Sequence, residues 1–290
     1  MQTTVFCGPS IGVFMTNPLL KVYKIGFIGA GSMSQALIKG IIESKLMKPE
    51  QILVSNRTPG KLLKLKEIYQ VQTRDHNEQI VEECDIVILA MKPQDLPQAM
   101  ENLTSAFSDK QIVISLAAGI NLKSLKRLIP YSRLVRLMPN TPSLIGRGVL
   151  GLLSDSQDEI VLDITKELFS GLGVVLELET EDQFDALMIS CSSGTGFVFE
   201  MMMYWQDWIS EHGFTEEQAK IMTVETFVGA SLLAAQSAGV DIEELQQRVT
   251  SKKGVTAAGL NSMRELEIER ALRISFEKAA MRSQEISRQN

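Results

Sequence analysis

The segment YKIGFIGAGSMSQALIKGIIESKL, from Tyr23 to Leu46, decides the fold because it carries a glycine motif between two elements of different periodicity. Residues 24–28 are predicted to form a short buried strand, and the apolar positions between 33 and 41 have the spacing of a helix. The motif G-x-G-x-x-S consists of Gly29, Gly31 and Ser34. A glycine turn that leads from a strand into a helix is typical of dinucleotide binding, because the helix N-terminus presents N–H groups to a pyrophosphate.

Each small residue of this motif has a steric role. Gly29 permits the tight turn, and Gly31 lets a pyrophosphate approach the backbone. Ser34 stands where a third glycine is common, and its small size preserves close packing of the helix on the strand. A glycine-rich turn without a ligand is the alternative, but the strand and helix on either side favour a dinucleotide site.

The turn after the second predicted strand, residues 51–54, indicates which dinucleotide is bound. An NAD enzyme usually has an acidic residue here to bind the ribose 2′-hydroxyl. This chain instead has Ser55, Asn56, Arg57 and Thr58. A cation among hydroxyl and amide groups suits a 2′-phosphate, so the sequence favours NADP(H), with a solvated turn as the alternative.

Apolar segments of strand length alternate with helical stretches through roughly the first 180 residues, which predicts an α/β fold with a Rossmann-type, doubly wound parallel sheet. Further strands are expected at residues 85–90, 111–115, 134–138 and 174–178. Ligands bind beyond the carboxyl ends of such strands. The loops at residues 90–93, 116–119 and 139–142 are therefore expected to surround the nicotinamide.

Beyond Glu181 the chain shows helical spacing and almost no strand signal, so an all-helical C-terminal domain is expected. The predicted organisation is a loose extension at 1–21, an NADP-binding Rossmann domain at 22–180, and a helical substrate-binding and dimerisation domain at 181–290. The strongly apolar segment 197–205 is predicted to be buried against other helices of this chain or of another subunit.

Two segments of small residues, 191–196 and 249–256, interrupt the helical pattern, and each precedes a helix. The N–H groups at a helix N-terminus bind carboxylates and phosphates. Together with a nicotinamide site, the two breaks favour a small anionic substrate. Ordinary helix capping by Ser and Thr is the alternative.

The composition excludes several other classes of protein. A net charge of -6 argues against nucleic-acid binding, whose non-specific part depends on basic surface. Two histidines and three cysteines are too few and too scattered for most metal sites, disulfide frameworks and catalytic triads, so no metal is expected. No apolar run approaches the roughly 20 residues of a membrane span. A cytoplasmic chain with reduced thiols is therefore expected.

The first 21 residues lack a basic segment and a clear cleavage site, so no signal peptide is predicted. They are interpreted as a loose extension before the folded domain. A translation start at Met15 is the alternative.

From about Tyr23 to its C-terminus the sequence resembles the pyrroline-5-carboxylate reductase family. Five motifs carry the resemblance: GFIGAGSM at 26–33, SNRT at 55–58, AMKPQ at 90–94, RLMPNTPSLIGRG at 136–148, and VTS…GVTAAGL at 249–260. The resemblance implies NADPH-dependent reduction of 1-pyrroline-5-carboxylate to L-proline, the last step of proline biosynthesis, by hydride transfer to a cyclic imine. It also implies an interlocked homodimer, sometimes assembled into decamers, with each site shared between protomers.

The resemblance also implies roles for individual residues. Contacts with NADPH would come from Ile28, Gly29, Ala30, Gly31, Ser32, Met33, Asn56, Arg57, Thr58, Asn77, Ala90, Met91, Lys92, Pro93, Leu116, Ala117 and Ala118. The substrate pocket would contain Glu181, Ser193, Gly194, Val255 and Thr256. The Thr256 hydroxyl, directly or through water, is the candidate hydrogen-bond partner of the imine nitrogen and the candidate catalytic residue.

The substrate half departs from the family pattern. The family's S-G-S-G-P-A reads CSSGTG at 191–196, and its T-S-P-G-G-T-T reads TSKKGVT at 250–256. Lys252 and Lys253 replace Pro and Gly, which either remodels the anion-binding loop or strengthens carboxylate binding.

These departures leave two alternatives: a divergent paralogue that reduces another cyclic imino acid, or a non-catalytic NADPH-binding protein such as a competence-associated relative. A hydroxyacid dehydrogenase of related architecture is disfavoured, because residues 194–200 lack the Asn…Lys pair of that class.

Overall fold

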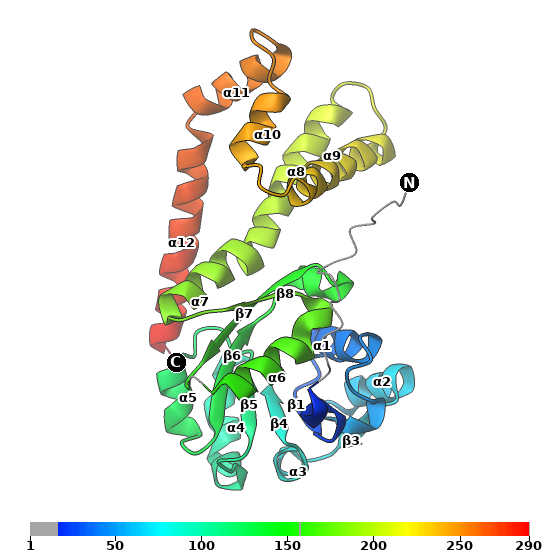
Figure 1. Cartoon of the computed structure of the whole chain (residues 1–290), viewed down its shortest axis with the longest axis vertical. Helices are drawn as coiled ribbons and strands as arrows, with labels where there is room; N and C mark the ends of the chain where they lie inside the picture. Colours follow the sequence, from blue (N-terminus) through cyan, green and yellow to red (C-terminus); the bar gives the residue numbers. More distant parts are fainter. Residues whose placement is uncertain (1–16, 157, 290) are drawn as a thin grey trace. The chain divides into compact units, whose positions relative to one another are not determined.

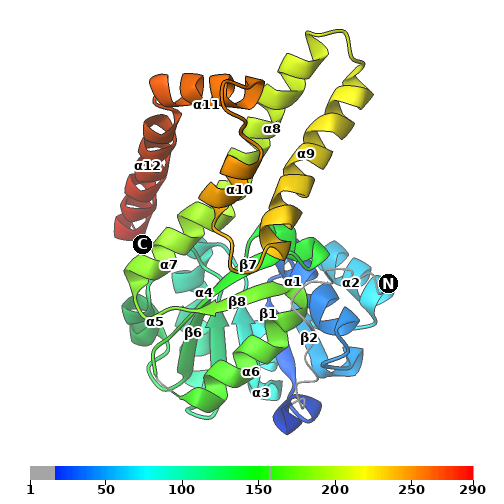
Figure 2. The ribbon, with the colours of Figure 1, turned by 45° about the horizontal axis from the view of Figure 1, so that its top comes forward.

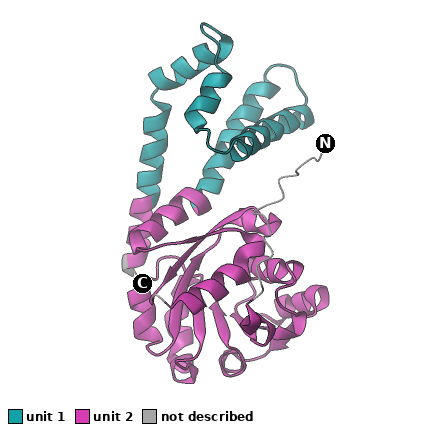
Figure 3. Cartoon of the chain, in the orientation of Figure 1, with its two compact units in different colours: residues 1–6, 193–279 teal, residues 7–192, 280–290 magenta. Residues whose placement is uncertain are grey.

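A computed structural model describes residues 17–156 and 158–289, with the side chains of residues 288 and 289 left out. The described chain forms two compact units, coloured separately in Figure 3. Residues 17–192 and 280–289 form one unit, called the sheet unit below, and residues 193–279 form the other, called the helical unit.

The sheet unit is built on eight strands in the order β3-β2-β1-β4-β5-β6-β7-β8. Their bounds are β1 (Ile25–Ile28), β2 (Ile52–Ser55), β3 (Gln72–Arg74), β4 (Ile86–Leu89), β5 (Ile112–Ser115), β6 (Arg133–Met138), β7 (Gly148–Ser154) and β8 (Gly173–Glu177). Neighbouring strands are parallel, except that β7 runs antiparallel to β6. The prediction of an α/β doubly wound sheet is confirmed.

Helices cover both faces of this sheet, as Figure 1 shows. One apolar cluster joins the strands to α1 (Ser32–Glu43), α2 (Pro59–Tyr69) and α6 (Glu159–Phe169). A second cluster joins the opposite face to α3 (Asn77–Glu83), α4 (Leu96–Leu103) and α5 (Leu122–Leu128). Because both faces are covered, successive strand residues such as Phe27 and Ile28 are buried in different clusters.

Short 3-10 helices occupy several connections in this unit. They are η1 (Pro18–Lys21), η2 (Pro49–Gln51), η3 (Pro93–Asp95), η4 (Thr104–Ala106), η5 (Thr141–Ile145) and η6 (Ser170–Leu172). Leu20 in η1 is fully buried in the first apolar cluster, so the end of the expected extension packs on the domain. The rest of that extension, residues 1–16, lies outside the described residues.

Two strands were not anticipated from the sequence. β3 is a three-residue, polar edge strand, and Gly148 and Gly151 interrupt the apolar residues of β7, so neither has the continuous β-branched run that was used to recognise the other strands. The antiparallel direction of β7 is possible because only the nine residues from 139 to 147 connect it to β6. A parallel return would need a longer crossover.

The helix expected to be interrupted at 191–196 is continuous, and this expectation is wrong. α7 (Glu181–Leu187) continues through a π-helix (Met188–Ser193) into α8 (Gly194–Ser210) without leaving the helical state. A π-turn widens the helix by one residue and satisfies its backbone groups. The small residues therefore do not create a helix N-terminus here.

The helical unit continues with α9 (Glu216–Gln236), α10 (Ile242–Arg248), α11 (Val255–Glu265) and most of α12 (Ile268–Gln289). α8 and α9 lie side by side and run in opposite directions in both Figure 1 and Figure 2. Trp205 and Phe227 make an edge-to-face contact between them, with ring centroids 5.5 Å apart. Most large apolar side chains of these two helices are nevertheless exposed.

The run Glu181–Ser210 is long and apolar enough to cross a membrane by length and composition alone, contrary to the expectation that no apolar run approaches that length. Only 17% of its most apolar window is buried within the chain.

Candidate active site

The glycine loop joins β1 to α1 in the geometry expected for a dinucleotide turn. Gly29 has φ +111°, and a Cβ added there would lie 2.7 Å from the Ala90 carbonyl oxygen, so only glycine fits. Ser34 is buried, and its hydroxyl donates a 2.7 Å hydrogen bond to the Gly29 carbonyl. The serine in the third motif position therefore fixes the turn as well as permitting close packing.

Two asparagines connect this loop to the next strand ends. The Asn56 side-chain oxygen accepts a 3.0 Å hydrogen bond from the Ala30 N–H. The Ser55 hydroxyl donates a 2.7 Å hydrogen bond to Asn77, the first residue of α3. The loops after β1 and β2 and the start of α3 are thereby held together.

The loops after β4 and β5 complete the same edge of the sheet. The Ala90 N–H donates to the Ile28 carbonyl at 3.0 Å, and the Leu116 N–H donates to the Leu89 carbonyl at 3.1 Å. The predicted cofactor residues brought together at this edge are Ile28, Gly29, Ala30, Gly31, Ser32, Met33, Asn56, Arg57, Thr58, Asn77, Ala90, Met91, Lys92, Pro93, Leu116, Ala117 and Ala118. Parallel strands place their carboxyl ends in one row, which is why segments so distant in sequence meet here.

The predicted substrate residues divide between the two units. Glu181 begins α7 in the sheet unit, whereas Ser193, Gly194, Val255 and Thr256 belong to the helical unit. Val255 and Thr256 open α11 and are exposed, with Val255 93% accessible. α11 begins directly after Gly254, which has no side chain to cap the helix, and anion binding at this N-terminus stays a prediction.

A cavity of about 270 Å³ in the sheet unit contains Glu181 and a buried arginine. Gly119, Asn121, Arg136, Glu181, Asp185, Gln284 and Ser287 line it. Gly119 is the last residue of the 116–119 loop expected to surround the nicotinamide, so the cavity lies beside the carboxyl end of β5.

Arg136 and Glu181 form the polar centre of this cavity. The Arg136 side chain is only 2% exposed, forms an ion pair with Glu181 through its Nη1 atom, and lies with its Cζ atom 3.7 Å from the Phe184 ring centroid. The other carboxylate oxygen of Glu181 accepts a 2.7 Å hydrogen bond from the N–H of Leu122, at the start of α5. Burial lowers the pKa of Arg136, and the negative charge of Glu181 opposes that shift.

Asp185 lies one helical turn after Glu181 in the same cavity. Burial raises the pKa of its carboxyl group; Arg136 opposes the shift, and Glu181 and Asp182 add to it. Perturbed carboxyl groups beside a cofactor edge are typical of functional sites.

Asn140, in the MPNTP segment, links β7 to the π-helix. Its side-chain oxygen accepts a 2.9 Å hydrogen bond from the Val149 N–H, and its nitrogen donates a 3.2 Å hydrogen bond to the Cys191 carbonyl. The Ser192 hydroxyl donates a second bond, 3.2 Å long, to the Pro139 carbonyl. The segment therefore holds the π-helix at the carboxyl end of β6.

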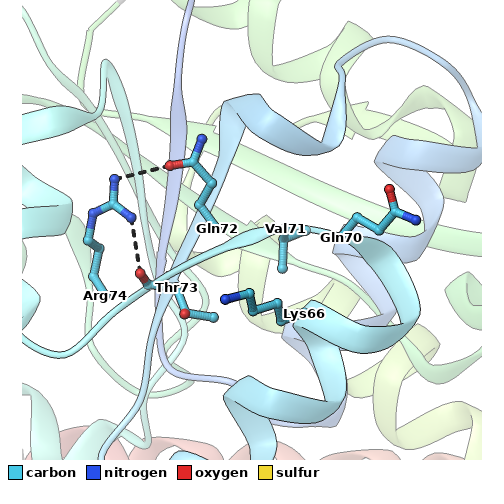
Figure 4. Close-up of a pocket in the computed structure, with 6 residues that line it drawn as sticks. All are labelled: Lys66, Gln70, Val71, Gln72, Thr73 and Arg74. Atoms are coloured by element: carbon cyan, nitrogen blue, oxygen red, sulfur yellow. Dashed lines mark hydrogen bonds between the residues drawn. The ribbon is translucent and has the colours of Figure 1, made fainter.

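A second cavity, of about 460 Å³, lies at the edge strand β3 and is shown in Figure 4. Its lining residues are Lys66, Gln70, Val71, Gln72, Thr73 and Arg74. The Arg74 guanidinium already donates to Gln72, to the Thr73 carbonyl and to Glu83. This cation is therefore occupied by its own neighbours and offers little to a ligand.

The sequence reading did not single out Arg136, Asp185 or Asn140. Arg136 was grouped with an apolar strand, although a lone cation inside such a run is itself a signal, because charged side chains are seldom buried without a partner. Asp185 has no comparable local pattern, because its environment depends on Arg136, which lies 49 positions earlier in the sequence.

Comparisons with known proteins find similar sequences and folds. Residues 24–119 match the family described as NADP oxidoreductase coenzyme F420-dependent, and residues 181–286 match the family described as pyrroline-5-carboxylate reductase dimerisation. The second match begins at Glu181, whereas the compact helical unit begins at residue 193.

Several whole proteins are also similar to this chain. It is 34% identical over 272 residues to pyrroline-5-carboxylate reductase 2 of Bacillus subtilis, which covers 92% of this chain and 96% of that relative. It is 32% identical over 267 residues to pyrroline-5-carboxylate reductase of Methanosarcina acetivorans, with 91% and 98% covered. The structure of a pyrroline-5-carboxylate reductase from Coxiella burnetii has a TM-score of 0.85 at 29% identity and covers 91% of this chain and 98% of its own.

The fold, the glycine loop and the match of the sheet domain define an oxidoreductase of the NADP-dependent class, which confirms the predicted cofactor type. The similarity over almost the full length of both chains narrows this class further. The chain belongs to the pyrroline-5-carboxylate reductase family.

Proposed function

We propose that this chain catalyses the NADPH-dependent reduction of 1-pyrroline-5-carboxylate to L-proline, the last step of proline biosynthesis. The observation that carries the proposal is the Arg136–Glu181–Asp185 cavity beside the cofactor edge, in a chain of this family. A small charged cavity at that position suits a small ligand that carries charges of its own.

The residues at the sheet edge fit the cofactor. A Cβ added at Gly31 would meet nothing within 4 Å, and the start of α1 has no side-chain cap, so its N–H groups can receive a pyrophosphate. Arg57 and Thr58 are exposed, and Arg57 forms no hydrogen bond or ion pair with any described residue, which leaves it available to a 2′-phosphate. When bound, NADPH supplies the hydride that reduces the imine carbon.

The chain's own residues must bind and orient the imino acid. The opening turn of α11 would receive the substrate carboxylate, because its N–H groups lack a capping side chain. Thr256 is proposed as the hydrogen-bond partner of the nitrogen. Hydride addition to carbon moves the C=N π electrons onto nitrogen. Formation of zwitterionic L-proline then consumes one proton if the imine is already protonated and two if it is neutral.

Purified full-length chain should oxidise NADPH when 1-pyrroline-5-carboxylate is added, and L-proline should appear in equal amount. NADPH binding is measured separately by fluorescence. Absence of turnover at every pH, with NADPH binding intact, would overturn the proposed reaction.

A second candidate, a divergent paralogue or a non-catalytic NADPH-binding protein, is favoured by the loop before α11. Lys253 there has φ +61°, in the left-handed region where the family pattern has glycine. If Lys252→Pro with Lys253→Gly gains activity that the natural chain lacks, the chain is a degenerate enzyme. If the natural chain is active and the double variant changes only KM, the reductase assignment stands.

We also propose that the exposed apolar surface of α8 and α9 is a homodimer interface. Among the described residues of the helical unit, the only buried apolar side chains are those of Ile209 and Ala219. Helices gain most of their stability from packing an apolar face, so this unit needs a partner. The match to a dimerisation domain supports a second copy of the chain.

A further inference from the structure

The two carboxylates in the sheet-unit cavity differ in what they already bind. Glu181 has one oxygen paired with Arg136 and the other bonded to the Leu122 N–H. Asp185 accepts no hydrogen bond and forms no ion pair with the residues that the structure describes. Asp185 is therefore the carboxylate of this cavity that has capacity left for a ligand.

Arg136 is held in place at an energetic cost. Its side chain is almost completely buried, and its Nε–H has no hydrogen-bond partner among the described residues. Buried polar groups without partners are rare in native proteins and are often found at functional sites. The arginine can be explained by its effect on Glu181, which it neutralises and orients.

The charges around the cavity leave it with a net negative character. Arg136 on β6 is positive, and Glu181 and Asp185 on α7 are negative, with the exposed Asp182 nearby. The other lining residues are uncharged: Gly119 and Asn121 before α5, and Gln284 and Ser287 on α12. Two carboxylates thus share one cation, and the cavity keeps one excess negative charge next to the loop expected to surround the nicotinamide.

We propose that Asp185 attracts the positive charge of a protonated cyclic imine, a role separate from the hydrogen bond proposed for Thr256, and that Arg136 is a positioning residue that occupies Glu181 so that Asp185 remains available. The proposal rests on the proposed reductase function and names the protonated imine as the form of the substrate that binds.

The charge of the nitrogen matters for the reaction. A protonated C=N group has a more electrophilic carbon than a neutral one, so a carboxylate that favours the protonated form assists hydride addition. During that addition the π pair of the C=N bond becomes the lone pair of nitrogen, which keeps its proton. The resulting secondary amine takes one further proton from water.

The pH dependence follows from the direction of the Asp185 shift. Its raised pKa means that the carboxyl group is still partly neutral at a pH where an exposed aspartate is fully ionised. Below that pKa the group cannot attract a cation, so kcat/KM is expected to rise with pH as Asp185 ionises. At higher pH the free imine loses its own proton, and kcat/KM falls again.

The test compares the full-length natural chain with Asp185→Asn, and uses Asp163→Asn as the matched control. Asp163 is an exposed carboxylate on α6, on the opposite face of the sheet. Binding of L-proline, whose ring nitrogen is cationic, is measured on the NADP⁺-loaded proteins beside tetrahydrofuran-2-carboxylate, whose ring oxygen is neutral. Steady-state pH profiles are measured with 1-pyrroline-5-carboxylate.

Asp185→Asn is expected to weaken L-proline binding about 10- to 100-fold, the usual effect of removing a charged hydrogen-bond partner, and to leave the ether analogue bound as before. It should also remove the acid limb of kcat/KM, whereas Asp163→Asn should change neither. Equal weakening of both ligands, or an unchanged acid limb, would overturn the assignment of Asp185. A natural chain that cannot turn over the imine would overturn the proposed function and this inference together.

Arg136 is tested with Arg136→Met and with the conservative Arg136→Lys. Loss of the cation should raise the pKa of Asp185 further, so Arg136→Met should move the acid limb of kcat/KM to higher pH. Arg136→Lys should restore most of the natural profile, and it keeps the test valid if the methionine variant does not fold. Lower activity in Arg136→Lys with no movement of the limb would show a structural role only.

Discussion

Arg57 is the residue that the structure leaves most available for the 2′-phosphate of NADPH, because it is exposed and unengaged among the described residues. Arg57→Ala should raise KM for NADPH about 10- to 100-fold, the usual value of a charge-assisted hydrogen bond. KM for NADH should not change, since NADH lacks the phosphate. The measurement is steady-state kinetics with both cofactors, with Lys64→Ala as a control. Equal effects on both cofactors would refute a role at the phosphate.

Cys84 offers a test of burial by pH. It is 4% exposed, and burial raises the pKa of its thiol from about 9 to about 12. In a variant whose other cysteines, Cys7 and Cys191, are serine, Cys84 should not react with a thiol reagent at pH 8 until urea unfolds the chain. Native labelling as fast as unfolded labelling would contradict this burial.

The raised pKa of Cys84 also makes the free energy of unfolding depend on pH, because the folded and unfolded chains bind the thiol proton differently. Between about pH 9 and about pH 12 the unfolded chain loses the Cys84 proton while the folded chain keeps it. The free energy of unfolding should therefore fall as pH rises through this window, and this component should disappear in Cys84→Ala. The measurement is urea denaturation of both proteins at neutral pH and at pH 10.

Asn140 connects two elements, the strand β7 and the π-helix, through two side-chain hydrogen bonds. Asn140→Ala removes both bonds and leaves the Val149 N–H without its partner, so the free energy of unfolding should fall by about 2–3 kcal/mol. Urea denaturation measures this, and Asn102→Ala, on the exposed side of α4, should have little effect. A loss of less than about 0.5 kcal/mol would show that the link contributes little.

The elements differ in how well the sequence could predict them. The central strands β1, β2, β4, β5 and β6 were recognised because parallel strands buried on both faces are continuous apolar runs. β3 was not predicted, because an edge strand needs no apolar run and the sequence of β3 is Gln-Thr-Arg.

The π-helix and the cavity could not be predicted, because both depend on contacts between residues far apart in the sequence. The small residues at 191–196 have the composition of a break, but hydrogen bonds from Asn140 and Ser192 to distant carbonyls accompany a continuous helix there. The glycine loop could be predicted from local sequence because its chemistry is local. The Arg136–Glu181–Asp185 group could not, since it depends on how β6 and α7 pack.

At the scale of the whole molecule, the helical unit has too little core of its own, which predicts assembly. Phe199 and Met203 lie four residues apart on α8, so they share one face of the helix, and they are 57% and 52% exposed. Burying such an apolar face is worth about 25 cal/mol for each Å² removed from water. Charges placed there would oppose any interface that uses it.

The natural chain should therefore have twice the mass of one chain by light scattering, and Phe199→Glu with Met203→Glu should shift it toward monomer and lower its thermal stability. Ile160→Glu supplies the control, because Ile160 is 57% exposed on α6 of the sheet unit and the change also replaces an exposed apolar side chain by a carboxylate. This control should remain dimeric and stable. A natural chain that stays monomeric at every concentration, or a double variant that stays dimeric, would show that this face of α8 is not the interface. If instead the double variant dissociates and also loses reductase activity while NADPH binding is kept, the helical unit contributes to the substrate site only as part of the assembly.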